Sequence, residues 1–303
     1  MSVISTANFP KLLWPGLNAV WGLNYKDPEK YFTAMFDVSS SEMQYEEDQE
    51  VTGFGLVPVK AQGTAITYDT HSQGYTKRYT HVPYGMGFII THEELMDNLY
   101  LKRGATRAKA LARSFRITKE TVAANVYNRG HNSSYTGGDG KELFATDHPT
   151  LNGTQSNELA VAADFSEAAL EDLLIQISKA VDSRGLKIGL TAQSIHFPVD
   201  LQFEVERVLK STLQSGTANN DINAIRSMGF FPKGAHKNPF LTDTDAFYIR
   251  TDAPEGLKLI DREEATFAQD GDFDSSNLKY KGYMRFSTGW SDWRGGYSNG
   301  GGA

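Results

Sequence analysis

The longest regular pattern of hydrophobic positions runs from residue 92 to about residue 128. Apolar residues recur there at near-helical spacing, no proline interrupts them, and the segment Thr91-His-Glu-Glu94 forms a capping box at the start. An unbroken helix of this length would measure roughly 55 Å at 1.5 Å per residue. Gly104 is the weak point at which it would break. The pattern predicts a helix as long as a whole domain.

Residues 49–90 follow a different pattern, in which residue types alternate with the two-residue period of a β-strand. The alternation covers residues 64–70 and 75–81, on either side of the turn segment His71-Ser-Gln-Gly74, so the sequence predicts a long β-hairpin. A two-stranded ribbon alone is marginally stable in water. Because no neighbouring segment supplies a third strand, the hairpin needs another surface, which could belong to another chain.

Residues 1–48 contain many aromatic residues without a lasting period. Pro10, Pro15 and Pro28 argue against a long helix, and one short helix is predicted after Asp27 as cap and Pro28 as first residue. These rings must be buried somewhere. They either pack on their own domain or reach a neighbouring subunit. We expect that a chain lacking residues 1–36 folds but assembles poorly.

The rest of the chain mixes helices and strands without simple alternation. Ser166 is expected to cap a second amphipathic helix that ends by Gly185, and a shorter helix is expected over 203–209. Strand-like runs cover 194–197, 246–249, 257–260 and 279–286. The fold class is therefore α+β.

Composition narrows the possible functions. The chain has 37 acidic against 30 basic residues, a net charge of −7, 40% hydrophobic residues and no cysteine. This is typical of a folded protein without disulfides or thiol chemistry, and it argues against a dedicated nucleic-acid binder. No stretch is apolar for the roughly 18 residues that a membrane helix needs, and the first residues do not resemble a signal peptide.

The search for catalytic motifs finds none. The seven histidines show no metal-binding spacing, and Asp147-His148-Pro149 is interpreted as a turn, so that His148→Ala is expected to have only a local effect. Asp270-Gly-Asp-Phe-Asp274 lacks the last ligand of a calcium loop. We therefore predict no catalytic residue, no cofactor and no metal, and the chain is expected not to be an enzyme. An alternative is a hydrolase that uses His148 and the aspartates clustered between residues 252 and 274.

Three segments resemble the major head subunits of Mu-like tailed phages and prophages. They are residues 143–149 (Leu-Phe-Ala-Thr-Asp-His-Pro), the run that begins Asn238-Pro-Phe-Leu, and residues 285–297, which include Gly-Trp-Ser-Asp-Trp-Arg-Gly-Gly. The resemblance covers most of the chain after residue 50. It implies the Hong Kong 97-type phage capsid fold, which has an N-terminal arm, an extended hairpin loop, a peripheral domain with a long spine helix, and an axial domain.

The predicted elements fit these parts in order. Residues 1–48 would be the arm, 49–90 the extended loop, 91–189 with 253–303 the peripheral domain, and 190–252 the axial domain. The arm is too short to hold the helical scaffolding segment of some relatives. The resemblance therefore implies a separate scaffolding protein.

The resemblance implies a major capsid protein that assembles with itself into hexamers and pentamers around packaged double-stranded DNA. It further implies a portal and a decoration protein as partners, weak non-specific contact with DNA, no membrane contact, and a place in the virion after assembly in the host cytoplasm. The alternative with the same fold is an encapsulin-like shell of a cellular nanocompartment.

Charged and aromatic residues of the arm, the hairpin and the long helix are the candidates for contacts between subunits. The helix carries a basic run from Lys102 to Lys119, and the acids from Glu42 to Glu50 offer it complementary charge on a neighbouring chain. The basic run could instead face packaged DNA. The candidate residues are Trp14, Trp21, Tyr31, Phe32, Phe36, Glu46, Glu47, Tyr68, Tyr79, Arg107 and Arg113.

Overall fold

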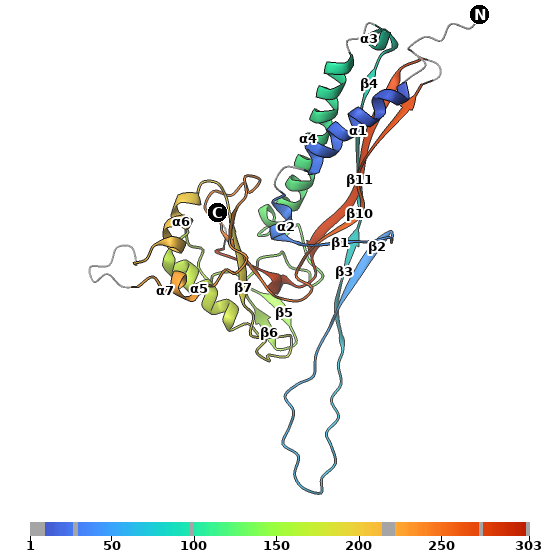
Figure 1. Ribbon diagram of the computed structural model, residues 1–303. Helices are drawn as coiled ribbons and strands as arrows, with labels where there is room; N and C mark the ends of the chain where they lie inside the picture. Colours follow the sequence, from blue (N-terminus) through green and yellow to red (C-terminus); the bar gives the residue numbers. More distant parts are fainter. Residues whose placement is uncertain (1–9, 27–29, 97–99, 214–221, 273–274, 301–303) are drawn as a thin grey trace, which may run out of the picture.

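The computed structural model describes residues 10–26, 30–96, 100–213, 222–272 and 275–300. It has an elongated part, in which helices lie along a long sheet, and a rounder part with a second sheet (Figure 1). A narrow ribbon projects from the region between the two parts.

The long sheet has four strands in the order β1-β10-β11-β4. Its centre is a long antiparallel hairpin, and β1 is the one strand that pairs in parallel. The strands are β1 (Asp37–Ser40), β4 (Val82–Ile90), β10 (Leu257–Gly271) and β11 (Leu278–Trp290). The strands predicted over 257–260 and 279–286 are thus confirmed.

Two helices pack along this sheet, α4 (Tyr100–Asn128) and α1 (Pro10–Lys26), and α3 (His92–Met96) precedes α4 (Figure 1). The predicted long helix is therefore present, although residues 97–99 lie outside the described part. Of the two possibilities that the sequence leaves open at Gly104, the structure has the unbroken one, since α4 continues through this residue. A Cβ atom at that glycine would lie 3.5 Å from Ile90 and 3.8 Å from Leu17, so α4 runs close to its neighbours there.

Helix α1 was not expected from the sequence. Pro10 is its first residue, where the missing N–H costs nothing, and an apolar stripe of Leu17, Val20, Trp21 and Tyr25 follows at helical spacing. The Trp21 ring stacks on Phe267 of β10 with the ring centres 5.0 Å apart. Helix α1 is thus part of the domain core.

The second sheet has the order β12-β9-β7-β8. Its strands are β7 (Ala192–Phe197), β8 (Ala235–Lys237), β9 (Tyr248–Thr251) and β12 (Gly296–Ser298), and the helices of this part are α5 (Glu167–Ser178), α6 (Gln202–Lys210) and α7 (Ala224–Met228). These strands and helices confirm the predictions over 194–197, 246–249 and 203–209. The Ser166 side chain accepts the Ala169 N–H at 3.1 Å, as expected of the cap of α5.

The core of the second part includes Leu170 and Leu173 of α5, Ile195 of β7, Ile249 of β9 and Tyr297 of β12. Helix α5 and strand β12 therefore pack with β7 and β9. The expected domain boundaries at residues 189 and 252 fall between these elements along the chain, and the division into domains stays a prediction.

The projecting ribbon pairs β2 (Tyr45–Val51) with β3 (Gln73–Thr80). Residues 52–72, here called the ribbon loop, form its distal end and contain no helix or strand. The predictions of a strand over 64–70 and of a turn at His71–Gly74 are therefore wrong. Strand β3 pairs with the acidic segment 45–51 instead. The chain turns near Gly63, whose φ of 83° suits a residue without a side chain.

The ribbon loop exposes large apolar side chains. Val59 is fully exposed, and Val57 and Tyr68 are exposed to 93% and 90%. Single exposed apolar residues are ordinary, but a run of them on one projection is typical of an interaction surface. Among the described helices, none is long and apolar enough to cross a membrane.

Candidate functional site: the junction at the base of the ribbon

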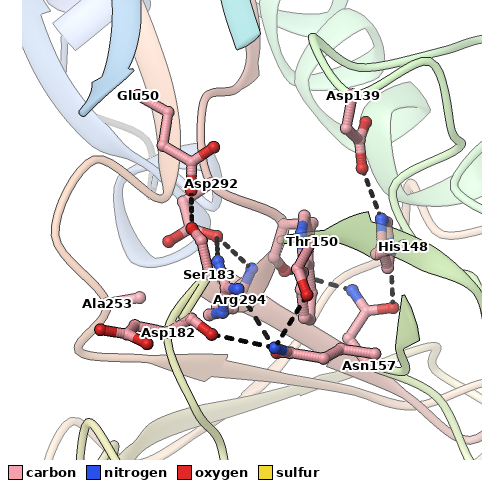
Figure 2. Close-up of polar contacts among 12 residues, drawn as sticks. Glu50, Asp139, His148, Thr150, Asn157, Asp182, Ser183, Ala253, Asp292 and Arg294 are labelled. Atoms are coloured by element: carbon pink, nitrogen blue, oxygen red, sulfur yellow. Dashed lines mark hydrogen bonds and ion pairs between the residues drawn. The ribbon is translucent and has the colours of Figure 1, made fainter. Parts of the chain in front are cut away.

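Four segments meet where the ribbon joins the two parts of the molecule, a place here called the junction (Figure 2). They are the base of the ribbon, residues 139–157 with the small hairpin β5 (His148–Thr150) and β6 (Gly153–Gln155), the turn 181–184, and residues 291–294, which lead into the short 3-10 helix η2 (Trp293–Gly295). Hydrogen bonds and ion pairs among their side chains set the direction in which the ribbon leaves the body.

His148 is fully buried at the junction. Its Nδ1 lies 2.6 Å from Asp139 Oδ2 and its Nε2 lies 3.1 Å from Asn157 Oδ1. The Asn157 amide nitrogen faces three carbonyl oxygens, which fixes the orientation of that side chain. Both ring nitrogens of His148 therefore face oxygen atoms of fixed side chains, which hold the ring in place.

The same imidazole stacks on Trp293, with ring centres 4.2 Å apart and planes 4° apart. The guanidinium group of Arg294 lies over the Trp293 indole, with its carbon 4.3 Å from the ring centre. Arg294 is 3% exposed, and its Nε donates to the Val181 carbonyl at 3.0 Å. This stack joins the small hairpin, the turn 181–184 and the end of the long sheet.

The turn 181–184 in turn holds the ribbon. Ser183 Oγ donates to a carboxylate oxygen of Glu50 on β2. Arg184 binds Asp69 Oδ2 of the ribbon loop at 2.7 Å and the Thr70 carbonyl. The backbone N–H groups of Gly55 and Thr70 hold the pKa of the Asp69 carboxyl below its usual range. The ribbon loop is thus tied to the body on one side.

The His148 side chain of the junction is not accessible to a substrate. His148 is fully buried and pairs with Asp139, whereas the hydrolase alternative needs it near the late aspartates and open to substrate. The interpretation of Asp147-His148-Pro149 as a simple turn is also wrong, because His148 begins β5 inside the core. Within the described part of the chain, no group of histidines and carboxylates could hold a metal ion.

A second cluster has the outline of a catalytic triad. His131 lies with Nε2 3.0 Å from Ser298 Oγ and with Nδ1 3.1 Å from Glu158 Oε2. Ser298 is completely buried within β12, so no substrate could reach its hydroxyl. The cluster fastens residue 158 to the second sheet, which is a structural role.

Several of the candidate subunit contacts have side chains that are buried within this chain. Trp21, Phe32, Phe36 and Tyr79 are at most 5% exposed. They pack on α4 and the long sheet, which supply the apolar surface that the sequence did not reveal as adjacent. Deleting residues 1–36 should therefore destabilise the subunit itself, in contrast to the expectation from the sequence.

Other candidates keep a route to a neighbour. Tyr68 is exposed on the ribbon loop, Arg113 is exposed on α4, and Tyr31 is half-buried beside Phe240. The side chain of Trp14 lies outside the described part. The structure does not bring the acidic and basic candidates together within one chain, because Glu47 pairs with Arg78, Arg107 pairs with Glu94, and Glu46 accepts from Ser41.

The segment before β1 is held by buried polar groups of α4. Glu120 accepts the backbone N–H groups of Tyr31 and Phe32, each at 3.0 Å, at the start of the short helix α2 (Phe32–Met35). The preceding residue, Lys119, binds both oxygens of Asp261 on β10 at 2.6 and 2.7 Å. Lys119 belongs to the basic run of this helix, and it is buried and ion-paired.

Burial raises the pKa of Glu120 to about 7, although the two N–H groups oppose the shift. A carboxyl whose pKa is raised on folding stabilises the fold most below its unfolded value, and this contribution is lost as pH rises through 7. In Glu120→Gln, the change in unfolding free energy between pH 5 and pH 8 should therefore shrink by on the order of 2 kcal/mol. Urea unfolding across this range, with Glu42→Gln as the exposed control, measures it, and an unchanged pH slope in Glu120→Gln would contradict the assignment.

Several solved structures are similar to this fold. A virus-like particle protein from Pyrococcus furiosus matches 94% of this chain and 97% of its own length at 11% identity, with a TM-score of 0.56. The capsid of a native GTA particle matches 89% of each chain at 11% identity and a TM-score of 0.56. A structure from Mycobacterium phage Che8 matches 89% of this chain and 90% of its own at 13% identity and 0.51. The chain has the Hong Kong 97-type capsid fold.

The family follows from the sequence itself. The family model described as "Phage capsid protein" matches residues 74–299, which is most of the chain. This protein belongs to the phage capsid protein family and is a shell protein with a structural role. No curated protein matches the sequence significantly. The narrower resemblance to Mu-like head subunits stays a prediction.

Proposed function

We propose that this chain is the major capsid protein of a tailed bacteriophage, and that it forms the hexamers and pentamers of a head around packaged double-stranded DNA. The observation that carries the proposal is the projecting ribbon, whose exposed apolar side chains have no cover within their own chain. In a closed shell, a neighbouring copy would cover them. Repeated head-to-tail contacts of this kind close into rings.

The parts of the chain take the following roles in the proposal. Residues 1–48 act as arm, 49–90 as extended loop, 91–189 with 253–303 as peripheral domain, and 190–252 as axial domain. Helix α4 is the spine of the peripheral domain. Helix α5 and strand β12 are exceptions to these ranges, because they pack with β7 and β9, and we assign them to the axial domain.

The partners implied by this role are a separate scaffolding protein, a portal and a decoration protein. DNA contact would be weak and non-specific, since the net charge is −7. The protein would be built in the host cytoplasm and end in the virion. Sedimentation of the full chain, alone and with a scaffolding protein, should show capsomers or larger particles, and a strict monomer in both would contradict the proposal.

A second candidate is an encapsulin-like shell of a cellular compartment. The similarity to the Pyrococcus furiosus virus-like particle supports it as far as the fold is concerned. The membership in the phage capsid family favours the virion. The contents of particles from native hosts, DNA or a cargo protein, distinguish the two.

The basic residues of α4 give a prediction on assembly. Arg113 is exposed, whereas Arg107 already pairs with Glu94 and Glu47 with Arg78 in the same chain. If the acidic segment 42–50 of a neighbouring copy contacts α4, Arg113→Glu should weaken empty-shell assembly more than Arg107→Glu does. The reason is that Arg107 is already paired within its own chain. The effect should fade as salt rises, because exposed pairs contribute about 0–1 kcal/mol each and are screened.

Light scattering of assembly at low and high salt measures this effect, with the exposed Lys179→Glu of the second part as control. Reversing Glu46 and Glu47 should restore part of the assembly. If Arg113→Glu builds normal empty shells and fails only in DNA packaging, α4 faces the DNA and the contact between chains is wrong.

A further inference from the structure

A groove lies between the C-terminal half of α4, the end of β11 and the segment 134–136. It encloses about 640 Å³ and is lined by Tyr84, Val126 and Trp290 as apolar surface, with Lys77 and Arg129 as cations. No acidic residue occurs among the described residues that line it. In a chain with a net charge of −7, this is an unusual combination.

The two cations of the groove have aromatic partners instead of carboxylates. The Lys77 ammonium lies 5.0 Å from the Trp290 ring centre, and the Arg129 guanidinium lies 4.6 Å from that of Tyr135. Lys77 also donates to the Thr136 carbonyl at 2.9 Å. Within the described part of the chain, neither cation makes an ion pair with a carboxylate.

The carboxylate whose charge acts on Lys77 is not paired with it. Asp139 acts on it electrostatically, but that carboxylate is buried and paired with His148 at 2.6 Å. Burial lowers the pKa of Lys77, with Asp139 opposing the shift. A partly desolvated cation without a paired anion gains when a carboxylate binds it. The groove thus offers two anion contacts on either side of an apolar floor.

We propose that this groove docks an acidic segment of a separate polypeptide, with carboxylates on Lys77 and Arg129 and an apolar side chain against Trp290 and Tyr84. The occupant is a peptide and not a duplex, because Lys77 is half-buried among the residues that line the groove. Duplex phosphates would meet the exposed Lys109 and Arg113 of α4 more easily. The proposal goes beyond the shell role, and it rests on that role in so far as the partner joins the shell.

The test uses the full chain and a fluorescein-labelled peptide of four glutamates around one leucine. Fluorescence anisotropy at low salt should show saturable binding that Lys77→Gln and Arg129→Gln each weaken about tenfold, since a charge-assisted contact is lost. Arg129 is exposed, so its variant should fold normally. Arg113→Gln removes an exposed cation from the same helix outside the groove, and it should leave the affinity unchanged.

Four results would overturn the proposal. An equal loss in Arg113→Gln would mean general charge attraction, and full competition by a duplex of equal charge would make DNA the ligand. Binding to capsomers but not to finished shells would show that a second copy covers the groove. If shells form normally but the peptide does not bind, the proposed docking site is refuted and the proposed shell function is not. Peptide binding by a chain that never forms shells supports the groove and refutes the proposed function.

Discussion

Replacing His148 by alanine should destabilise the subunit by about 3–5 kcal/mol, because it leaves the buried Asp139 carboxylate without its partner. The change also removes the ring that stacks on Trp293. This expectation reverses the one drawn from the sequence. The junction should loosen with it, so that the ribbon loses its fixed direction and assembly fails together with stability.

Urea unfolding of the subunit measures this effect. His71→Ala is the matched control, since that histidine is exposed at the base of the ribbon loop and should change stability little. Asp139→Ala combined with His148→Ala should cost less than the sum of the two single changes, because the double variant leaves no buried charge unpaired. Additive costs would contradict a direct ion pair.

The ribbon loop should show the opposite behaviour. Changing Val57, Val59, Ile66 and Tyr68 to serine should leave the stability of the subunit unchanged, because these side chains are already in water. Assembly should collapse, since each apolar side chain that a neighbour covers contributes on the order of 1.5–3 kcal/mol. Light scattering of assembly and urea unfolding of the subunit together separate the two effects.

Leu151 and Val161, exposed to 63% and 80% outside the ribbon loop, supply the control pair. Their change to serine should affect neither stability nor assembly. Hydrogen exchange of residues 52–72 gives a second check, with fast exchange in the lone subunit and protection in the shell. Normal shells from the four-serine variant would show that the ribbon loop is not the contact.

Periodicity identified the elements that are long and that carry their own apolar stripe. Helix α4 and strands β10 and β11 are of this kind, and their residues pack where the pattern predicts. The sequence does not predict helix α1, because Pro10 and Pro15 argue against a helix. Pro10, however, stands at the first helical position, where proline is tolerated.

Partners that lie far apart along the chain were not predictable from pattern. Alternation over residues 64–70 suggested a strand, but a strand needs an edge to pair with, and the edge of β3 is taken by residues 45–51. Likewise, His148 and Trp293 meet through the fold alone. The family resemblance, in contrast, indicated the capsid fold without depending on these contacts, since it rests on residues 143–149 and 238–297.

Electron microscopy of the purified full chain, co-expressed with a scaffolding protein, tests the central claim most directly. The account predicts closed shells in which fivefold and sixfold rings of this one chain coexist. Monomers, or small oligomers that never close into a shell under these conditions, would contradict it.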